Sequence, residues 1–203
     1  ERAVYFPQPG DPVEPEVSFR RPAWHTAIAR ECEAAAQRVA VLDLPGFTKF
    51  EVTGPGAEAW LDGLVANKVP TKVGRIALCH ALTKRGGIRT EFTITKLAEH
   101  HYYVVSAGAA ERYDSDFLQK RLPTDGSVAL RNITGSRGVF VLAGPRARDV
   151  MAKLTDVPLD NASFPWLTGQ VIEAGLATDV YALRVNFVGS LGWELHFPIE
   201  YAH

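Results

Sequence analysis

Two glutamates that follow glycine turns carry side chains able to do acid–base or anion chemistry. Glu91 comes after Gly86-Gly87, in a run where apolar and polar residues alternate. This period of two predicts a strand, and it places the Glu91 side chain on the face opposite Phe92. Glu194 follows a second glycine turn and shares a strand face with His196. Because a fixed carboxylate can accept a proton or stabilise a nearby cation, both glutamates are candidate site residues.

A hairpin is the element expected to position Glu91. Strand-like residues 76–83 and 88–97 flank the Gly86-Gly87 pair, and glycine supplies the positive φ angles of a tight hairpin turn. A lone glutamate on a strand is most often a solvated surface residue, so the interpretation of Glu91 depends on the rest of the chain. Support comes from Glu194, which places a second carboxylate at a similar strand turn further along.

The chain contains an internal repeat in the order strand, Gly-Pro, helix, Val-Pro. Residues 50–70 read FEVTGPGAEAWLDGLVANKVP, and residues 140–158 read FVLAGPRARDVMAKLTDVP. The repeat predicts an α+β fold of two related halves, about 40–122 and 128–203. We expect antiparallel or mixed sheets in the halves, packed around a central ligand site.

Other patterns are weaker guides to chemistry. Residues 54–59 match the dinucleotide fingerprint G-x-G-x-x-A, but Pro55 removes a backbone donor, so a structural helix start is the preferred interpretation. The adjacent pair His100-His101 has no third ligand in register, and no metal site is predicted. Cys32 and Cys79 lack the spacing of a metal site and are expected to be reduced, partly buried thiols.

Composition and charge narrow the class of protein. The chain has 203 residues, of which 46% are hydrophobic and 22% charged, so it can bury a substantial core. Its formal net charge of -1 excludes the strong basic excess of a nonspecific nucleic-acid binder. No apolar stretch approaches the roughly 18 residues of a membrane span. We expect small-molecule or protein partners, no nucleic acid, no membrane, and a cytoplasmic or mitochondrial-matrix location.

The two ends of the chain suggest a piece of a longer protein. Residues 1–25 are rich in proline, which predicts a linker or a wrapping arm. Residues 26–39 have helical periodicity and are expected to form an amphipathic helix packed on the core of a domain that spans residues 26–203. The chain stops directly after a strand pattern, so the C-terminal part of this domain is expected to be missing.

Several motifs in order resemble one family. They are VLDLPGFTKFEVTGP at 41–55, Gly74-Arg75, the GGIRTE element at 86–91, and VGSLGWEL at 188–195. Together they resemble the tetrahydrofolate-binding domain of the glycine cleavage T-protein, or aminomethyltransferase, family over roughly residues 30–198. Within that family the sequence of these motifs is most similar to the C-terminal folate domain of dimethylglycine and sarcosine dehydrogenases.

The resemblance implies a truncated T-protein folate-binding fold and roles for four residues. Glu91 would be the catalytic carboxylate that assists attack of tetrahydrofolate on a methylamine-derived iminium, giving 5,10-methylenetetrahydrofolate. Glu194 would bind the pterin ring. Leu78 and Ser106 stand where T-proteins commonly carry Tyr and Asn, and they would be cofactor-binding positions. FAD would belong only to a presumed upstream flavin domain that is absent from this chain.

Alternatives to this function stay open. The chain departs from the T-protein pattern at Glu91, where T-proteins usually carry Asp, and at Ser190 in the last turn. One alternative is another enzyme of the same fold, either a T-protein or a different folate-dependent demethylase. The alternative of another class is a non-catalytic folate-binding or domain-packing module.

Overall fold

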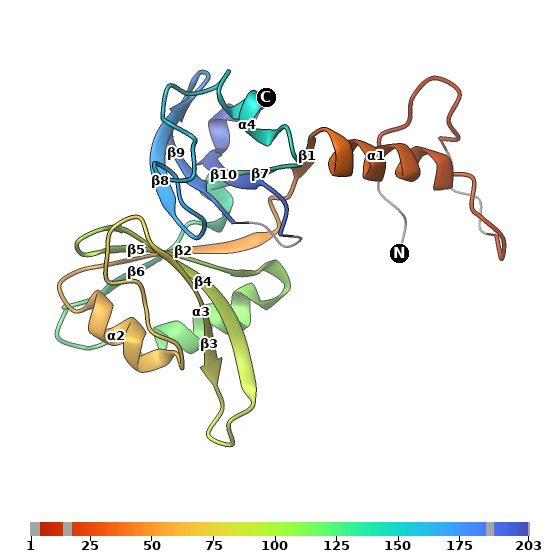
Figure 1. Cartoon of the computed structure of the whole chain (residues 1–203). Helices are drawn as coiled ribbons and strands as arrows, with labels where there is room; N and C mark the ends of the chain where they lie inside the picture. Colours follow the sequence, from red (N-terminus) through yellow and green to blue (C-terminus); the bar gives the residue numbers. More distant parts are fainter. Residues whose placement is uncertain (1–4, 14–17, 186–188, 203) are drawn as a thin grey trace.

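The computed structural model describes residues 5–13, 18–185 and 189–202. Within these ranges the strands form two five-stranded sheets in which neighbouring strands are antiparallel (Figure 1). The first sheet has, in spatial order, β3 (Ile76–Leu82), β4 (Ile88–Ala98), β5 (His101–Ala107), β2 (Phe47–Thr53) and β6 (Ala129–Asn132). The second has β8 (Gly169–Ala174), β9 (Ala177–Leu183), β10 (Gly192–Pro198), β7 (Arg137–Ala143) and β1 (Ala40–Asp43). The α+β expectation is therefore confirmed.

The helices are α1 (His25–Gln37), α2 (Ala57–Leu64), α3 (Glu111–Gln119) and α4 (Ala147–Met151). Helices α2 and α3 cover the outer face of the first sheet, and α4 covers that of the second. Phe92 and Tyr102 of the first sheet are buried in one core with Leu61 of α2 and Phe117 of α3. Trp193 of β10 is buried in a second core with residues of α4.

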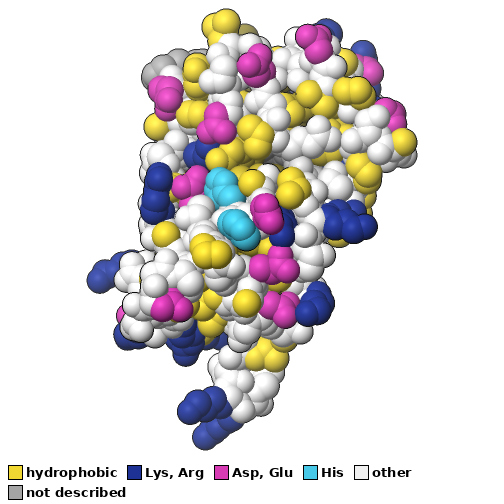
Figure 2. Space-filling model, turned by 90° about the vertical axis from the view of Figure 1, so that its left-hand side faces the viewer, with side chains coloured by type: hydrophobic (Ala, Val, Ile, Leu, Met, Phe, Trp, Pro, Cys, Tyr) yellow, Lys and Arg dark blue, Asp and Glu magenta, His cyan; other side chains and the backbone are white. Residues whose placement is uncertain are grey.

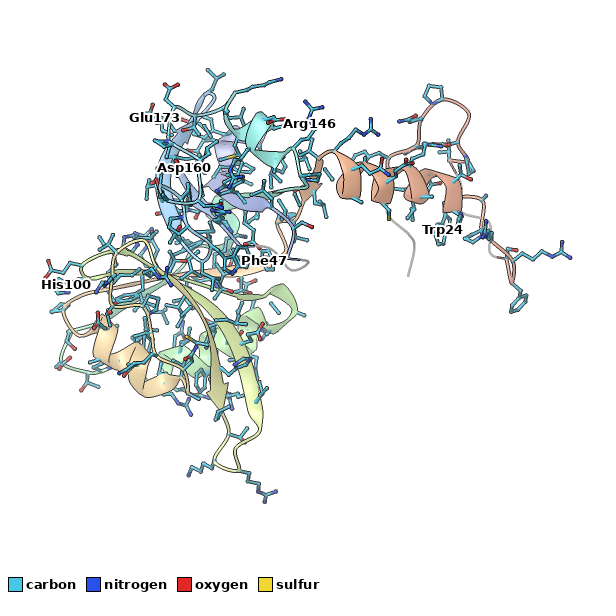
Figure 3. The ribbon with its side chains drawn as sticks, in the orientation of Figure 1. Trp24, Phe47, His100, Arg146, Asp160 and Glu173 are labelled. Atoms are coloured by element: carbon cyan, nitrogen blue, oxygen red, sulfur yellow. The ribbon has the colours of Figure 1, made fainter. Side chains whose placement is uncertain are left out.

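A third cluster joins the inner faces of the sheets. It contains Tyr103 and Val105 of β5 together with Tyr181 and Leu183 of β9. Phe47, labelled in Figure 3, packs against this cluster at the junction of the sheets. The two halves therefore meet through their sheets, and side chains on these inner faces are the ones that can form a shared site.

The halves exchange their first strands. β1 precedes β2 in the chain but pairs with β7, whereas β6 precedes β7 but pairs with β2. The spatial orders β3-β4-β5-β2-β6 and β8-β9-β10-β7-β1 are the same once each exchanged strand is assigned to the sheet that it completes. The related halves predicted from the repeat are present, but the sheets cut across the expected boundaries at 122 and 128.

The two Gly-Pro glycines hold this exchange in place. Gly54 has φ 114° and Gly144 has φ 130°, a region that side chains rarely adopt. A Cβ atom on Gly54 would lie 2.4 Å from the carbonyl oxygen of Ser127, just before β6, and one on Gly144 would lie 2.7 Å from that of Arg38, just before β1. The fingerprint-like sequence at 54–59 thus has a packing explanation, as expected.

Two expectations about the N-terminal region are wrong: the helix does not pack on the core of the domain, and Cys32 is not partly buried. The helix forms, but Ala27 is the buried residue of α1, and Figure 1 shows the helix extending away from both sheets. Its polar side chains contact the preceding segment instead, since Glu31 accepts a hydrogen bond from the backbone N–H of Phe6 at 2.7 Å. Cys32 is consequently exposed, whereas Cys79 is buried. The helical periodicity predicted an apolar stripe on this helix, but it could not predict which part of the protein would pack against that stripe.

No helix in the described ranges is long and apolar enough to cross a membrane. The strand expected at 181–188 ends at Leu183 in the structure, and residues 186–188 lie outside the described ranges. The linker expected at residues 1–25 has no regular helix or strand in its described part before α1. The division into linker and domain stays a prediction.

Candidate functional site

Glu91 lies on β4 directly opposite His80 of β3. Its Oε2 atom is 2.8 Å from Nε2 of His80, and 52% of its side chain is exposed. As predicted, the carboxylate points away from Phe92, which is buried in the helix-covered core. His80 was not anticipated as a partner, because a bulge between Ala81 and Leu82 shifts the register of this hairpin.

Leu78 shares the Glu91 face of the first sheet. Leu78 is opposite Thr93, which is in turn opposite Val105 of the inter-sheet cluster. Cross-strand neighbours project to the same face, and alternate residues of a strand do as well. Leu78 and Glu91 therefore project on the face that looks toward the second sheet, where Leu78 is 47% exposed.

Glu194 lies on the inner face of the second sheet, and only 6% of it is exposed. His196, two residues along β10, places Nε2 at 3.1 Å from Oε2 of Glu194. The other ring nitrogen of His196, Nδ1, is 2.8 Å from the hydroxyl of Tyr103 on β5. This chain of three side chains crosses from one sheet to the other.

Burial and two hydrogen-bond partners keep the His196 ring neutral. Complete burial lowers the pKa of His196 below its ordinary value of 6.5, although the hydrogen bond to Glu194 acts in the opposite direction. Burial also raises the pKa of Tyr103 well above 10, so the phenol keeps its proton. A neutral ring that donates from Nε2 to Glu194 and accepts at Nδ1 from Tyr103 satisfies all three groups.

A buried lysine stands beside this chain of side chains. Lys49 of β2 is 0% exposed, and its Nζ donates to the carbonyl oxygens of Pro45 at 2.9 Å and Phe47 at 2.8 Å. Burial lowers the pKa of Lys49, and its positive charge contributes to the lowered pKa of His196. No carboxylate among the described residues forms an ion pair with Lys49.

Ser106 lies on the other face of the first sheet. Strand alternation groups it with Tyr102 and Val104, which are buried beneath the helices, and only 5% of Ser106 is exposed. Its hydroxyl has no hydrogen-bond partner within the described residues. The structure thus places Glu91 and Leu78 on one inner face and Glu194 on the facing sheet, while Ser106 projects away from them.

The two candidate carboxylates do not occupy equivalent positions in the halves. Phe50 is opposite Val104, and its repeat counterpart Phe140 is opposite Leu195. Tyr103 immediately precedes Val104, and Glu194 immediately precedes Leu195. Tyr103 and Glu194 therefore occupy equivalent positions in the two halves. The expectation of two carboxylates at similar turns is corrected, because Glu91 follows the β3–β4 turn whereas Glu194 follows the β9–β10 connection.

The histidine pair near α2 does not form a metal centre in the described part of the chain. No group of three or more His, Cys, Asp or Glu side chains with metal-binding geometry occurs there. His100, labelled in Figure 3, lies at the β4–β5 turn and lines a shallow hollow with Glu58, Lys96 and other residues. Figure 2 shows histidine side chains among acidic ones on this side of the molecule.

The comparison with protein families decides the assignment. The GCVT N-terminal domain model matches residues 1–203. The chain belongs to this family. This GCVT domain is built of two related halves and carries the Glu91 and Glu194 carboxylates on its inner sheet faces.

Relatives and a solved structure agree with this assignment. Dimethylglycine dehydrogenase, mitochondrial, of Rattus norvegicus is 34% identical over 201 residues, covering 98% of this chain and 23% of that protein. The pyruvate dehydrogenase phosphatase regulatory subunit, mitochondrial, of Mus musculus is 30% identical over 207 residues, covering 100% of this chain and 24% of that protein. The aminomethyltransferase T of the Bartonella henselae glycine cleavage system superposes with a TM-score of 0.74 at 22% identity, covering 86% of this chain and 46% of that one. The GCVT domain thus spans about a quarter of these curated relatives, and its aminomethyltransferase-like fold is confirmed.

Proposed function

We propose that the GCVT domain binds tetrahydrofolate and accepts a one-carbon unit within an N-demethylating dehydrogenase of the dimethylglycine or sarcosine type. Family membership and the 34% identity to dimethylglycine dehydrogenase support the reaction class. The observation that carries the proposal is the nearly buried Glu194 carboxylate between the two sheets, held by a neutral donor. A charged acceptor in such a place is costly unless a ligand or a partner uses it.

The residues present fit a reduced pterin. A pterin offers a ring N–H and an amino group side by side, and a carboxylate is the matching paired acceptor. Glu194 would hold this edge, and the exposed Leu78 on the facing sheet would contact the apolar surface of the ligand. Ser106 remains a proposed contact only if the ligand reaches the opposite face of β5.

Glu91 is suited to proton transfer near such a ligand. When bound, tetrahydrofolate supplies the amine nitrogens that take up the one-carbon unit. The Glu91 carboxylate would stabilise a nearby iminium cation and accept the proton released as the amine reacts. His80, 2.8 Å from Oε2 of Glu91, would orient the carboxylate and share that proton.

The remaining parts of the reaction lie outside this chain. An FAD-dependent domain upstream would oxidise the methylamine to the iminium, and it would be the domain's natural partner. No residue of this chain is assigned to flavin binding. Two of the relatives named above are mitochondrial proteins, and a mitochondrial location stays a prediction for this protein.

Calorimetric titration of the full-length gene product with tetrahydrofolate tests the proposal. We expect saturable binding that weakens at least about tenfold in Glu194→Gln, because the variant loses the charged acceptor, a change worth about 1.4 kcal/mol or more. Glu173→Gln is the matched control, since Glu173 is exposed on edge strand β8 of the same sheet (Figure 3). Absence of binding by the wild-type protein would refute the assignment.

A non-catalytic folate-binding or packing module is the second candidate. It is favoured by the 30% identity to a protein named as a regulatory subunit. The two candidates differ in the intact protein, because a module would bind the folate without transferring a one-carbon unit.

A further inference from the structure

We propose that His196 and Tyr103 are positioning residues that hold the Glu194 carboxylate in one orientation for a ligand with paired N–H donors. This inference deepens the proposed function and rests on it. Neither residue needs to touch the ligand, because both act through Glu194. The hydrogen-bond chain that they form is the observation that carries the inference.

Each hydrogen bond from Tyr103 through His196 to Glu194 has a defined donor and acceptor. Because the Glu194 carboxylate can only accept, Nε2 of the neutral His196 ring carries the proton, and Nδ1 accepts from the Tyr103 hydroxyl, which lies 2.8 Å away. Nε2–H then donates to Oε2 of Glu194 at 3.1 Å. Removing the hydroxyl of Tyr103 would leave the buried Nδ1 acceptor without a donor, so the ring would no longer be held between two partners and could turn away from the carboxylate. Glu194 would then lose its fixed orientation.

Packing keeps the ring in place. His196 is 0% exposed, and its ring meets the Tyr103 ring edge-on with centroids 5.3 Å apart. Tyr181, opposite His196 on β9, also meets Tyr103 edge-on at 5.1 Å. The donor thus comes from the first sheet and the carboxylate from the second, so the orientation of Glu194 depends on the docking of the two halves.

The charges around His196 favour the neutral ring. Lys49 approaches from β2, and Nη1 of Arg137 on β7 donates to the backbone carbonyl of His196 at 3.3 Å. Glu194 on the same strand favours a proton on the ring, whereas both of these cations oppose it. The phenols of Tyr103 and Tyr181 face the ring as neutral groups. Nε2–H is therefore the single donor from the ring to Glu194 across the neutral pH range.

Tetrahydrofolate affinity of the full-length protein tests the inference. From the cost of leaving a buried polar group unpaired, Tyr103→Phe is expected to weaken binding about 5- to 100-fold. Tyr181→Phe removes the neighbouring hydroxyl but keeps its ring, and binding should change less than about twofold. His196→Gln, whose amide can still donate and accept, should bind more tightly than His196→Leu.

A spectroscopic measurement separates this inference from the proposed function. In a ¹⁵N-histidine spectrum, His196 should be neutral with the proton on Nε2, and Tyr103→Phe should change that signature without ligand. If the wild-type protein binds no tetrahydrofolate, the proposed function fails. If the wild-type protein binds but Tyr103→Phe binds equally well, or if the ring is protonated on Nδ1, the positioning role is overturned. Urea unfolding of each variant shows whether a loss of binding reflects a loss of folding.

Discussion

Replacing Gly54 by alanine should destabilise the fold strongly, because this glycine joins the two halves. Its φ of 114° is strained for alanine, which costs about 1–3 kcal/mol. The added methyl group would lie 2.4 Å from the carbonyl oxygen of Ser127, which is backbone and cannot rotate away. That oxygen also accepts the hydrogen bond from the N–H of Gly56 at 3.0 Å. Forcing these segments apart costs about 1–3 kcal/mol more, so the expected loss is about 2–6 kcal/mol.

Gly63→Ala is the matched control in the same helix region. Gly63 lies in α2, and a Cβ atom there meets nothing within 4 Å. Alanine should therefore stabilise the helix by about 0.5–1 kcal/mol. The two substitutions add the same methyl group, so the difference between them reports the φ strain at Gly54 together with the contact with Ser127.

Urea unfolding followed by tryptophan fluorescence measures both variants. With a slope near 2 kcal/mol per M, the Gly54→Ala midpoint should fall by about 1–3 M. A Gly54→Ala protein within about 0.5 kcal/mol of the wild type would refute the packing explanation of the Gly-Pro motif. Loss of ligand binding at unchanged stability would instead favour the phosphate-loop interpretation of residues 54–59.

Three further predictions follow from burial. Because the unfolded chain protonates His196 near pH 6.5 while the folded chain resists that proton, stability should fall as the pH drops below about 6.5, and less so in His196→Gln; urea midpoints at pH 8 and 5.5 measure this. Burial raises the pKa of Cys79 to about 11, so iodoacetamide should label the exposed Cys32 of the folded protein and reach Cys79 only in denaturant, as read by mass spectrometry. Glu91→Gln should change the free energy of unfolding by less than about 0.5 kcal/mol, since the side chain is half exposed; a larger loss would mark Glu91 as structural.

Local periodicity predicted the faces of the strands well. The alternation around Glu91 and Phe92 placed the two side chains on opposite faces of the sheet, with Phe92 in the core, as the structure confirms. The pattern WELHF likewise separated Trp193, in the core under α4, from Glu194 and His196 on the inner face. These predictions succeed because the side-chain direction of a strand depends only on neighbours along the chain.

Features that depend on distant pairing could not be predicted. The exchange of β1 and β6 follows from contacts between halves, and the repeat by itself fits exchanged and unexchanged strands equally. The hydrogen bond between Tyr103 and His196 joins the two sheets, so no local sequence pattern predicts it. Lys49 is fully buried although lysine is rarely so, because its ammonium reaches backbone carbonyls at the start of its own strand.

Transfer of the one-carbon unit is the most direct test of the proposed function. Full-length wild type and Glu91→Gln would each be mixed with dimethylglycine and tetrahydrofolate for a single turnover, with a trap present for free formaldehyde. The wild type should form 5,10-methylenetetrahydrofolate, and Glu91→Gln should form it about 10²–10⁴-fold more slowly, while binding tetrahydrofolate with little change. Equal rates of formation in the two proteins, or trapped formaldehyde as the only product of the wild type, would contradict the role given to Glu91.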